Sequence, residues 1–253
     1  MAFLNRLLLT EPSDAVRRFF LISFLGLTFL VLGLDSVPAA DYGLHGQAWA
    51  DGLAIAYFAL LLWALTPQQR LMALVFVPFS AIGEGIFSLL FGLYRYRLGM
   101  VPLYVPFGHA ILFSMGLLMS ELPVIRDRKE QLRPIFTALY IAAFGIAIII
   151  LQDTLSAIFG LVFLWVLRRK GYQPLYFLMG LFVLYVELVG THWGCWAWAP
   201  HPFNQSWLHA TNPPVGAFAC YVLADLGVMK IVRHLSSRLE LNEVSTPTTS
   251  VPT

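Results

Sequence analysis

The sequence predicts an all-α protein, a polytopic integral membrane helical bundle with about eight transmembrane helices arranged as two parallel four-helix repeats. Hydrophobic residues make up 58% of the chain and charged residues only 12%, whereas soluble domains usually carry about 25% charged residues. The mean hydropathy is +0.73. A glutamate within an apolar stretch, followed by a Gly-x-aromatic-x-aromatic motif, occurs once in each half of the chain.

The apolar stretches have about the length that a membrane span requires, which is near 20 residues. They are expected at residues 17–37, 48–65, 71–93, 101–120, 134–151, 154–168, 172–191 and 213–231. The sixth is short, and only Gln152-Asp153-Thr154 separates it from the fifth, so these two should form a tight helical hairpin. Residues 1–123 then form the first repeat and 134–234 the second. Residues 235–253 should be a disordered cytoplasmic tail, because their end is rich in Ser, Thr and Pro.

The start of the chain allows a second interpretation. Residues 19–34 followed by Val37-Pro38-Ala39-Ala40 resemble a secretory signal peptide with a small-residue cleavage site. Glu11 and Asp14 lie before this stretch, and the repeat needs a first helix. The sequence therefore favours an uncleaved first span.

Basic residues predict the orientation, because Lys and Arg concentrate in cytoplasmic connections. They occur before the first helix, after the last, and in alternate connections between: Arg17, Arg18, Arg70, Arg126, Arg128, Lys129, Arg133, Arg168, Arg169, Lys170, Lys230, Arg233 and Arg238. Both termini are expected in the cytoplasm, with the protein integral to a bacterial inner membrane. The net charge of +2 does not indicate a nucleic-acid partner.

The repeated motif is the main functional signal. The first copy comprises Glu84, Gly92-Leu93-Tyr94-Arg95-Tyr96 and Pro106-Phe107-Gly108, and the second comprises Glu187, Gly194-Cys195-Trp196-Ala197-Trp198 and Pro214-Val215-Gly216. A charged side chain at the bilayer centre costs about 2.5–3.5 kcal/mol on insertion scales. Two such residues at matching positions indicate two halves that face one shared site, although so short a motif can also recur by coincidence.

The predicted topology places most other polar residues near the same outer side. The catalytic candidates are Glu84, Glu187, His109 and Asp225. The candidates for substrate binding are Tyr94, Arg95, Tyr96, Arg97, His192, Trp196, Trp198 and Asn212. Each also has a structural interpretation: the acids and His109 as partners in interhelical hydrogen bonds, and the aromatic residues as an interfacial belt. No metal site or cofactor is predicted, because no metal-binding or redox-cysteine spacing is present.

Two segments of the first motif resemble a known family. Phe91-Gly92-Leu93-Tyr94-Arg95-Tyr96 and Val101-Pro102-Leu103-Tyr104-Val105-Pro106 are similar to the bacterial and archaeal carotenoid hydratases, over about residues 84–109. The resemblance implies a polytopic enzyme that adds water to a terminal isoprenoid double bond. On this hypothesis Glu84 is the acid and Glu187 or His109 the base. Aromatic faces would stabilise the intermediate carbocation.

Three other functions remain open at this stage. Arg95 and Arg97 could hold the phosphate of a lipid headgroup or polyprenyl substrate. Internal repeats with an acid in each half also fit a proton-coupled transporter. A non-catalytic membrane assembly protein is the third. The expected partners are the bilayer and a membrane lipid or isoprenoid substrate, and the sequence does not predict the oligomeric state.

Overall fold

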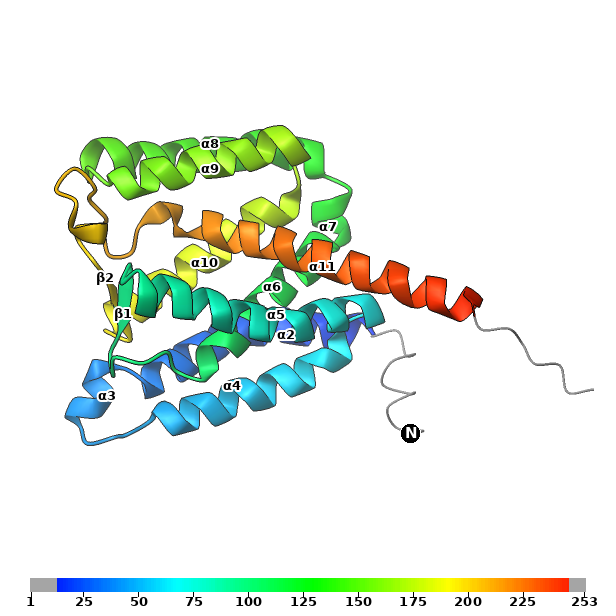
Figure 1. Ribbon diagram of the computed structural model, residues 1–253, viewed down its shortest axis with the longest axis horizontal. Helices are drawn as coiled ribbons and strands as arrows, with labels where there is room; N and C mark the ends of the chain where they lie inside the picture. The colour runs from blue at the N-terminus through cyan, green and yellow to red at the C-terminus, as the bar shows by residue number, and fades with distance from the viewer. Residues whose placement is uncertain (1–12, 246–253) are drawn as a thin grey trace, which may run out of the picture.

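The computed structural model describes residues 13–245 of the 253-residue chain, with side chains described as far as residue 235. Its described part is helical apart from one pair of three-residue strands (Figure 1). Six helices in this part are long and apolar enough to cross a membrane: Asp14–Leu34, Gln47–Ala64, Pro67–Leu90, Lys129–Ile150, Pro174–His192 and Val215–Leu235. These features are those of an all-α integral membrane protein.

Two of the long helices in the first half begin at residues that cap the helix N-terminus. Ser13 caps the first long helix, and Thr66 and Gln69 form a capping box at the start of the third, where Pro67 takes the first helical position. Its elements are α2 (Asp14–Leu34), α3 (Val37–Asp41), α4 (Gln47–Leu61), η1 (Leu62–Ala64), α5 (Pro67–Glu84), the π-helical turn η2 (Gly85–Leu90), β1 (Tyr94–Tyr96) and α6 (Tyr104–Ser120).

The second half also contains a π-helical turn, and a three-residue strand that follows a long helix. Asp153 caps α9 by accepting a hydrogen bond from the Ser156 backbone N–H, which produces the tight helical hairpin that the sequence predicts. Its elements are α7 (Pro123–Arg126), α8 (Lys129–Gly145), the π-helical turn η3 (Ile146–Ile150), α9 (Thr154–Lys170), α10 (Pro174–His192), β2 (Trp196–Trp198), η4 (Pro202–Asn204), η5 (Val215–Ala217) and α11 (Phe218–Ser245).

Each predicted apolar stretch overlaps one long helix, but two of these helices are not among the six that are long enough to cross a membrane. The helices α6 and α9 have 17 residues each. At 1.5 Å per residue, each spans about 25 Å, slightly less than the roughly 30 Å hydrocarbon core of a bilayer. The six longer helices support a multi-pass protein, while the full set of eight spans stays a prediction.

Four helices form the centre of the bundle. The helix α5 packs against α6 and α11, and α10 packs against the same two helices. The pair α2 and α4 covers one flank of this group, and α8 and α9 cover the other (Figure 1). Both halves of the chain therefore contribute two helices to one central layer, which is the arrangement that a shared site requires.

The two ends of the bundle differ in composition. The strands β1 and β2 lie together with α3 at one end, while α7 and the C-terminal part of α11 lie toward the other (Figure 1). Aromatic side chains of the repeated motif are thus separated from the basic connection that contains Arg126. The orientation of these ends in a cell membrane stays a prediction.

Two helix ends differ from the predicted apolar stretches. The helix α11 continues to Ser245, so residues 235–245 do not begin a disordered tail; residues 246–253 lie outside the described part. The helix α6 begins only at Tyr104, although the predicted apolar stretch begins at residue 101. Pro106 therefore lies in the first turn, where its missing N–H has no intrahelical partner to lose.

Candidate functional site

The two copies of the motif meet as paired strands. The strands β1 and β2 are antiparallel, with Tyr94 opposite Trp198 and Tyr96 opposite Trp196. Because side chains alternate along a strand, these four aromatic residues share one face and are buried, while the central residue of each strand is exposed. Segments about a hundred residues apart in the chain thus form one four-ring surface.

Each strand is preceded by a glycine in the left-handed region of backbone space. Gly92 has φ +61° and Gly194 has φ +70°. Residues other than glycine are strained at such angles, so the glycine of the motif is explained by the turn that it makes. The main chain then returns toward the bundle and directs the aromatic residues at the helix that carries the glutamate.

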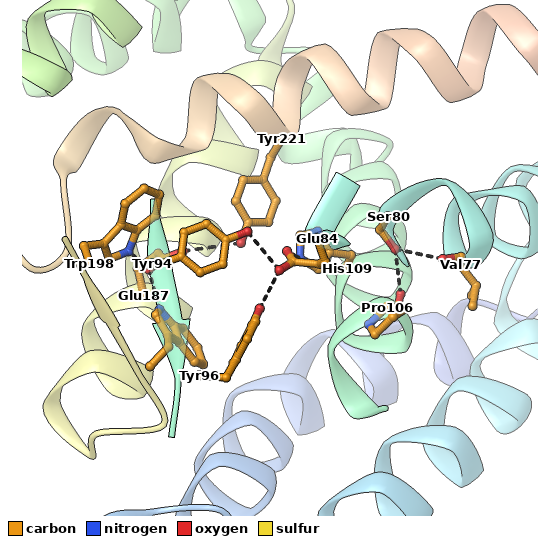
Figure 2. Close-up of polar contacts among 11 residues, drawn as sticks. Val77, Ser80, Glu84, Tyr94, Tyr96, Pro106, His109, Glu187, Trp198 and Tyr221 are labelled. Atoms are coloured by element: carbon orange, nitrogen blue, oxygen red, sulfur yellow. Dashed lines mark hydrogen bonds and ion pairs between the residues drawn. The ribbon is translucent and has the colours of Figure 1, made fainter. Parts of the chain in front are cut away.

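Glu84 is buried, with 4% of its surface exposed, at the end of α5 where the π-helical turn η2 begins. Its Oε2 accepts hydrogen bonds from the hydroxyls of Tyr94 at 2.8 Å and Tyr96 at 2.7 Å. Its Oε1 lies 2.9 Å from Nε2 of His109 (Figure 2). Both carboxyl oxygens therefore have close partners, and π-helical turns of this kind are frequent at functional sites.

Glu187 has a similar arrangement in the second half. It lies on α10, is also 4% exposed, and its Oε2 accepts hydrogen bonds from the indole N–H groups of Trp196 and Trp198, both at 2.9 Å. Its Oε1 has a longer contact, 3.4 Å from the hydroxyl of Tyr221. One oxygen of Glu187 is firmly held, while the other has only this weak partner.

Tyr221, which was not predicted from the sequence, contacts Glu187 directly and is linked to Glu84 through His109. Its ring stacks on the imidazole of His109 with centroids 4.7 Å apart and an interplanar angle of 2°. Its hydroxyl contacts Glu187, so one side chain of α11 connects both halves (Figure 2). A sequence signal was available, because Tyr221 precedes Asp225 by one helical turn and so shares its face of the helix.

The start of α6 is held near α5 by a side-chain bond. Ser80 donates its hydroxyl to the carbonyl of Pro106 at 3.2 Å and to that of Val77 at 3.0 Å (Figure 2). Ser80 lies one turn before Glu84 on α5, and Pro106 lies three residues before His109 on α6. This bond therefore helps to fix the distance between Glu84 and His109.

The tyrosines of β1 remain hydrogen-bond donors over a wide pH range. Burial, together with the nearby Glu84 carboxylate, raises the pKa of the Tyr94 and Tyr96 hydroxyls well above the usual value near 10. At neutral pH both hydroxyls thus stay protonated and donate hydrogen bonds to Glu84.

The two carboxyl groups, His109 and the aromatic side chains that contact them border one cavity of about 170 Å³. Its wall combines Glu84, Glu187, His109 and Tyr221 with apolar side chains from both halves, among them Phe24, Leu27, Val31, Phe79, Phe87, Val105, Leu112, Phe159 and Val186. An apolar cavity with a few converging polar groups is the usual form of a small-molecule site. The structure thus brings Glu84 and Glu187 to a shared cavity, as the repeat predicts.

The two arginines of the first motif lie elsewhere. Arg97 forms a buried ion pair with Asp35, its Nε donates to the Asp35 carbonyl at 2.8 Å, and the Tyr104 hydroxyl binds the same carboxylate at 2.9 Å. Arg95 is the exposed residue of β1 and faces away from the aromatic surface. Neither residue lines the cavity. The Arg97–Asp35 pair instead fastens β1 to the end of α2.

The other predicted site residues lie outside the cavity wall. His192 is exposed at the end of α10. The side-chain oxygen of Asn212 accepts a hydrogen bond from the Trp198 backbone N–H at 3.0 Å and so supports β2. Asp225 is completely buried on α11, and both its carboxyl oxygens lack a hydrogen-bond partner among the described residues.

Both cysteines are free thiols. Cys195 is buried, its Sγ lies 3.2 Å from the Leu32 carbonyl, and burial raises the pKa of this thiol to about 12. Cys220 lines the cavity beside Tyr221. Within residues 13–245, no group of three or more His, Cys, Asp or Glu side chains is placed to hold a metal ion.

No family model, curated protein or solved structure matches this chain. The chemistry of the site therefore has to be inferred from the cavity and its polar groups.

Proposed function

We propose that this protein is a membrane enzyme that transfers protons to and from a carbon–carbon double bond of an apolar, isoprenoid-like lipid. One observation carries the proposal: two buried carboxyl groups, each bound by two aromatic donors, border a single apolar cavity. Intramembrane acids are costly and mark functional sites by default. An apolar cavity selects an apolar substrate, on which the carboxyl groups are the natural reagents.

The hydrogen bonds favour Glu187 as the acid, which changes the roles expected from the sequence. A protonated carboxyl must have one oxygen available to donate. Both oxygens of Glu84 have partners within 2.9 Å, whereas Oε1 of Glu187 has only the 3.4 Å contact with Tyr221. Glu187 can thus present a proton to the cavity, and Glu84 with His109 can act together as the base.

The proposed reaction starts with proton transfer from Glu187 to one carbon of the double bond. The π bond breaks, a C–H bond forms, and the positive charge moves to the more substituted carbon. The faces of the aromatic rings that line the cavity can stabilise this cation.

Hydration, the reaction that the resemblance implies, follows if water attacks the cation. A C–O bond forms, and His109 with Glu84 accepts the proton that the water loses. Tyr221 stacks on His109 through its ring and contacts Glu187 through its hydroxyl, so this hydroxyl can pass a proton to Glu187 once water delivers one. The overall change is addition of one water, and the enzyme recovers its starting protonation.

The test is a mass measurement on protein reconstituted in lipid nanodiscs with an acyclic isoprenoid polyene. In ¹⁸O-labelled water the product should gain one labelled water, and in deuterated water it should gain deuterium on carbon. The change Glu187→Gln should reduce both by at least about a hundredfold, the usual share of a general acid. The matched control is Glu130→Gln, because that carboxyl is 67% exposed on α8. If the wild type adds neither label to a range of acyclic isoprenoids, the proposal is wrong.

A proton-coupled carrier is the second candidate, and Asp225 is the observation that favours it. Its carboxyl is buried and has no hydrogen-bond partner in the part of the chain that the structure describes, and it lies one helical turn from Tyr221 but outside the cavity wall. A carrier needs such a group to bind and release protons during transport. Uptake of protons into proteoliposomes that depends on Asp225, together with no change in the mass of any lipid, would favour the carrier.

A further inference from the structure

Two glycines, Gly83 and Gly108, belong to the cavity wall. On α5 the wall is formed by Ser80, Gly83, Glu84 and Phe87, and on α6 by Val105, Gly108, His109 and Leu112. Both sets have the spacing of a single helix face. In each helix the glycine comes directly before the proposed base residue and leaves that part of the wall without a side chain.

These two glycines differ from those that the packing requires. A Cβ on Gly190 would lie 2.0 Å from the Trp196 ring, and one on Gly180 would lie 1.8 Å from the Tyr140 hydroxyl. Among the described residues, no atom would lie within 4 Å of a Cβ on Gly83 or Gly108. Since both residues line the cavity, the open space beside them is cavity space.

Glycine within a helix lowers the stability of the protein, so its presence at these two positions needs an explanation. It destabilises a helix interior by roughly 1 kcal/mol relative to alanine, because it loses more backbone freedom on folding. Neither Gly83 nor Gly108 has a positive φ that would require glycine. Alanine would fit both backbones and would not clash, so neither backbone geometry nor helix packing explains these residues.

We propose that Gly83 and Gly108 determine the bulk of the substrate end that reaches the carboxyl groups. A cavity of about 150 Å³ engineered in another protein binds benzene, so the 170 Å³ here holds a group of similar size. The site thus accepts a chain end of about six carbon atoms, a compact branched group, while the rest of the chain lies outside the cavity. The identification of that chain as isoprenoid rests on the proposed function, but the size limit does not.

The experiment measures binding, so it does not depend on turnover. Trp196 and Trp198 border the cavity, and a conjugated acyclic polyene bound there should quench tryptophan fluorescence in nanodiscs. The variants are Gly83→Val, Gly108→Val and the milder Gly108→Ala. The matched control is Gly52→Val, because Gly52 is an exposed helical glycine of α4 with no atom near its Cβ position and no part in the cavity wall.

Each valine should weaken polyene binding by about tenfold or more, the usual effect of a misfit of this size in an apolar pocket. Gly108→Ala should weaken it less while leaving the melting temperature equal or higher, because alanine is the better helix former. Unchanged affinity in both valine variants, with normal binding by the wild type, would overturn the inference. Absence of polyene binding by the wild type would instead refute the proposed isoprenoid substrate.

A second comparison keeps the size limit testable in that case. Thermal stabilisation by a small apolar ligand such as benzene should be lost in Gly83→Val and Gly108→Val and kept in Gly52→Val, whatever the natural substrate is. Equal stabilisation of the wild type and all three variants would show that these glycines do not determine the volume of the cavity.

Discussion

Replacement of Glu84 by leucine tests whether this carboxyl group holds the site together. The change removes the acceptor of three buried donors, the Tyr94 and Tyr96 hydroxyls and the His109 imidazole. Each buried donor left without a partner costs about 1–3 kcal/mol. The two hydroxyls alone should therefore lower the free energy of unfolding by roughly 2–6 kcal/mol. In Glu84→Gln the amide oxygen can still accept from both hydroxyls, so the loss should stay near 1 kcal/mol.

A combined variant separates the donors from the acceptor. In the triple change Glu84→Leu, Tyr94→Phe and Tyr96→Phe, no hydroxyl is left without a partner. Replacing all partners with apolar groups of similar shape is often nearly neutral. The triple variant should thus recover most of the stability that Glu84→Leu loses. If the effects of the three substitutions were additive, the triple variant would instead be the least stable.

The assay is reversible denaturant unfolding in detergent micelles, followed by circular dichroism, with Glu130→Leu as the exposed control on α8. A wild-type-like stability of Glu84→Leu would contradict the hydrogen-bonded arrangement around Glu84. A triple variant that is less stable than Glu84→Leu would show that the loss has another cause, such as packing around the leucine.

Three further predictions concern the neighbourhood of the site. Arg97→Ala should cost about 3–5 kcal/mol in the same unfolding assay because it leaves the buried Asp35 charge unpaired, and Arg97→Met combined with Asp35→Leu should restore most of this. In a Cys220→Ala variant, Cys195 should resist alkylation at pH 8 by mass spectrometry, because its pKa is about 12 and the thiolate forms only as pH rises toward that value; rapid labelling of the folded protein would contradict this. Tyr221→Phe keeps the ring but loses the hydroxyl, so turnover should fall about tenfold, less than for loss of a general acid, with an unchanged melting temperature; full turnover would exclude the hydroxyl from proton return.

The sequence was sufficient to predict the helices and the two carboxyl groups because both depend on local patterns. Apolar stretches of membrane length stand out against the few charged residues, and the glycine-aromatic motif is recognisable twice. The pairing of β1 with β2 supports the prediction that Glu84 and Glu187 face one site. The hypothesis that the two halves arose by duplication stays a prediction.

Residues whose role depends on distant partners could not be assigned from the sequence. Arg97 was predicted to bind substrate because it lies in the first motif, yet it pairs with Asp35, which is 62 residues away. Tyr221 contacts Glu187 across 34 residues and stacks on a histidine from the other half. Such contacts follow from helix packing, which local spacing does not reveal.

The two carboxyl groups differ in the chemistry of their hydrogen-bond donors, and this difference suggests different roles in proton transfer. An indole N–H can only donate a hydrogen bond, whereas a tyrosine hydroxyl can also accept one and an imidazole can carry a proton. Trp196 and Trp198 can hold Glu187 but cannot take its proton, so that proton leaves only through Oε1, toward the cavity or Tyr221. The partners of Glu84 can accept and pass on protons. Under the proposed function, the first half of the chain would therefore exchange protons with water, and the second would hold one proton for the substrate.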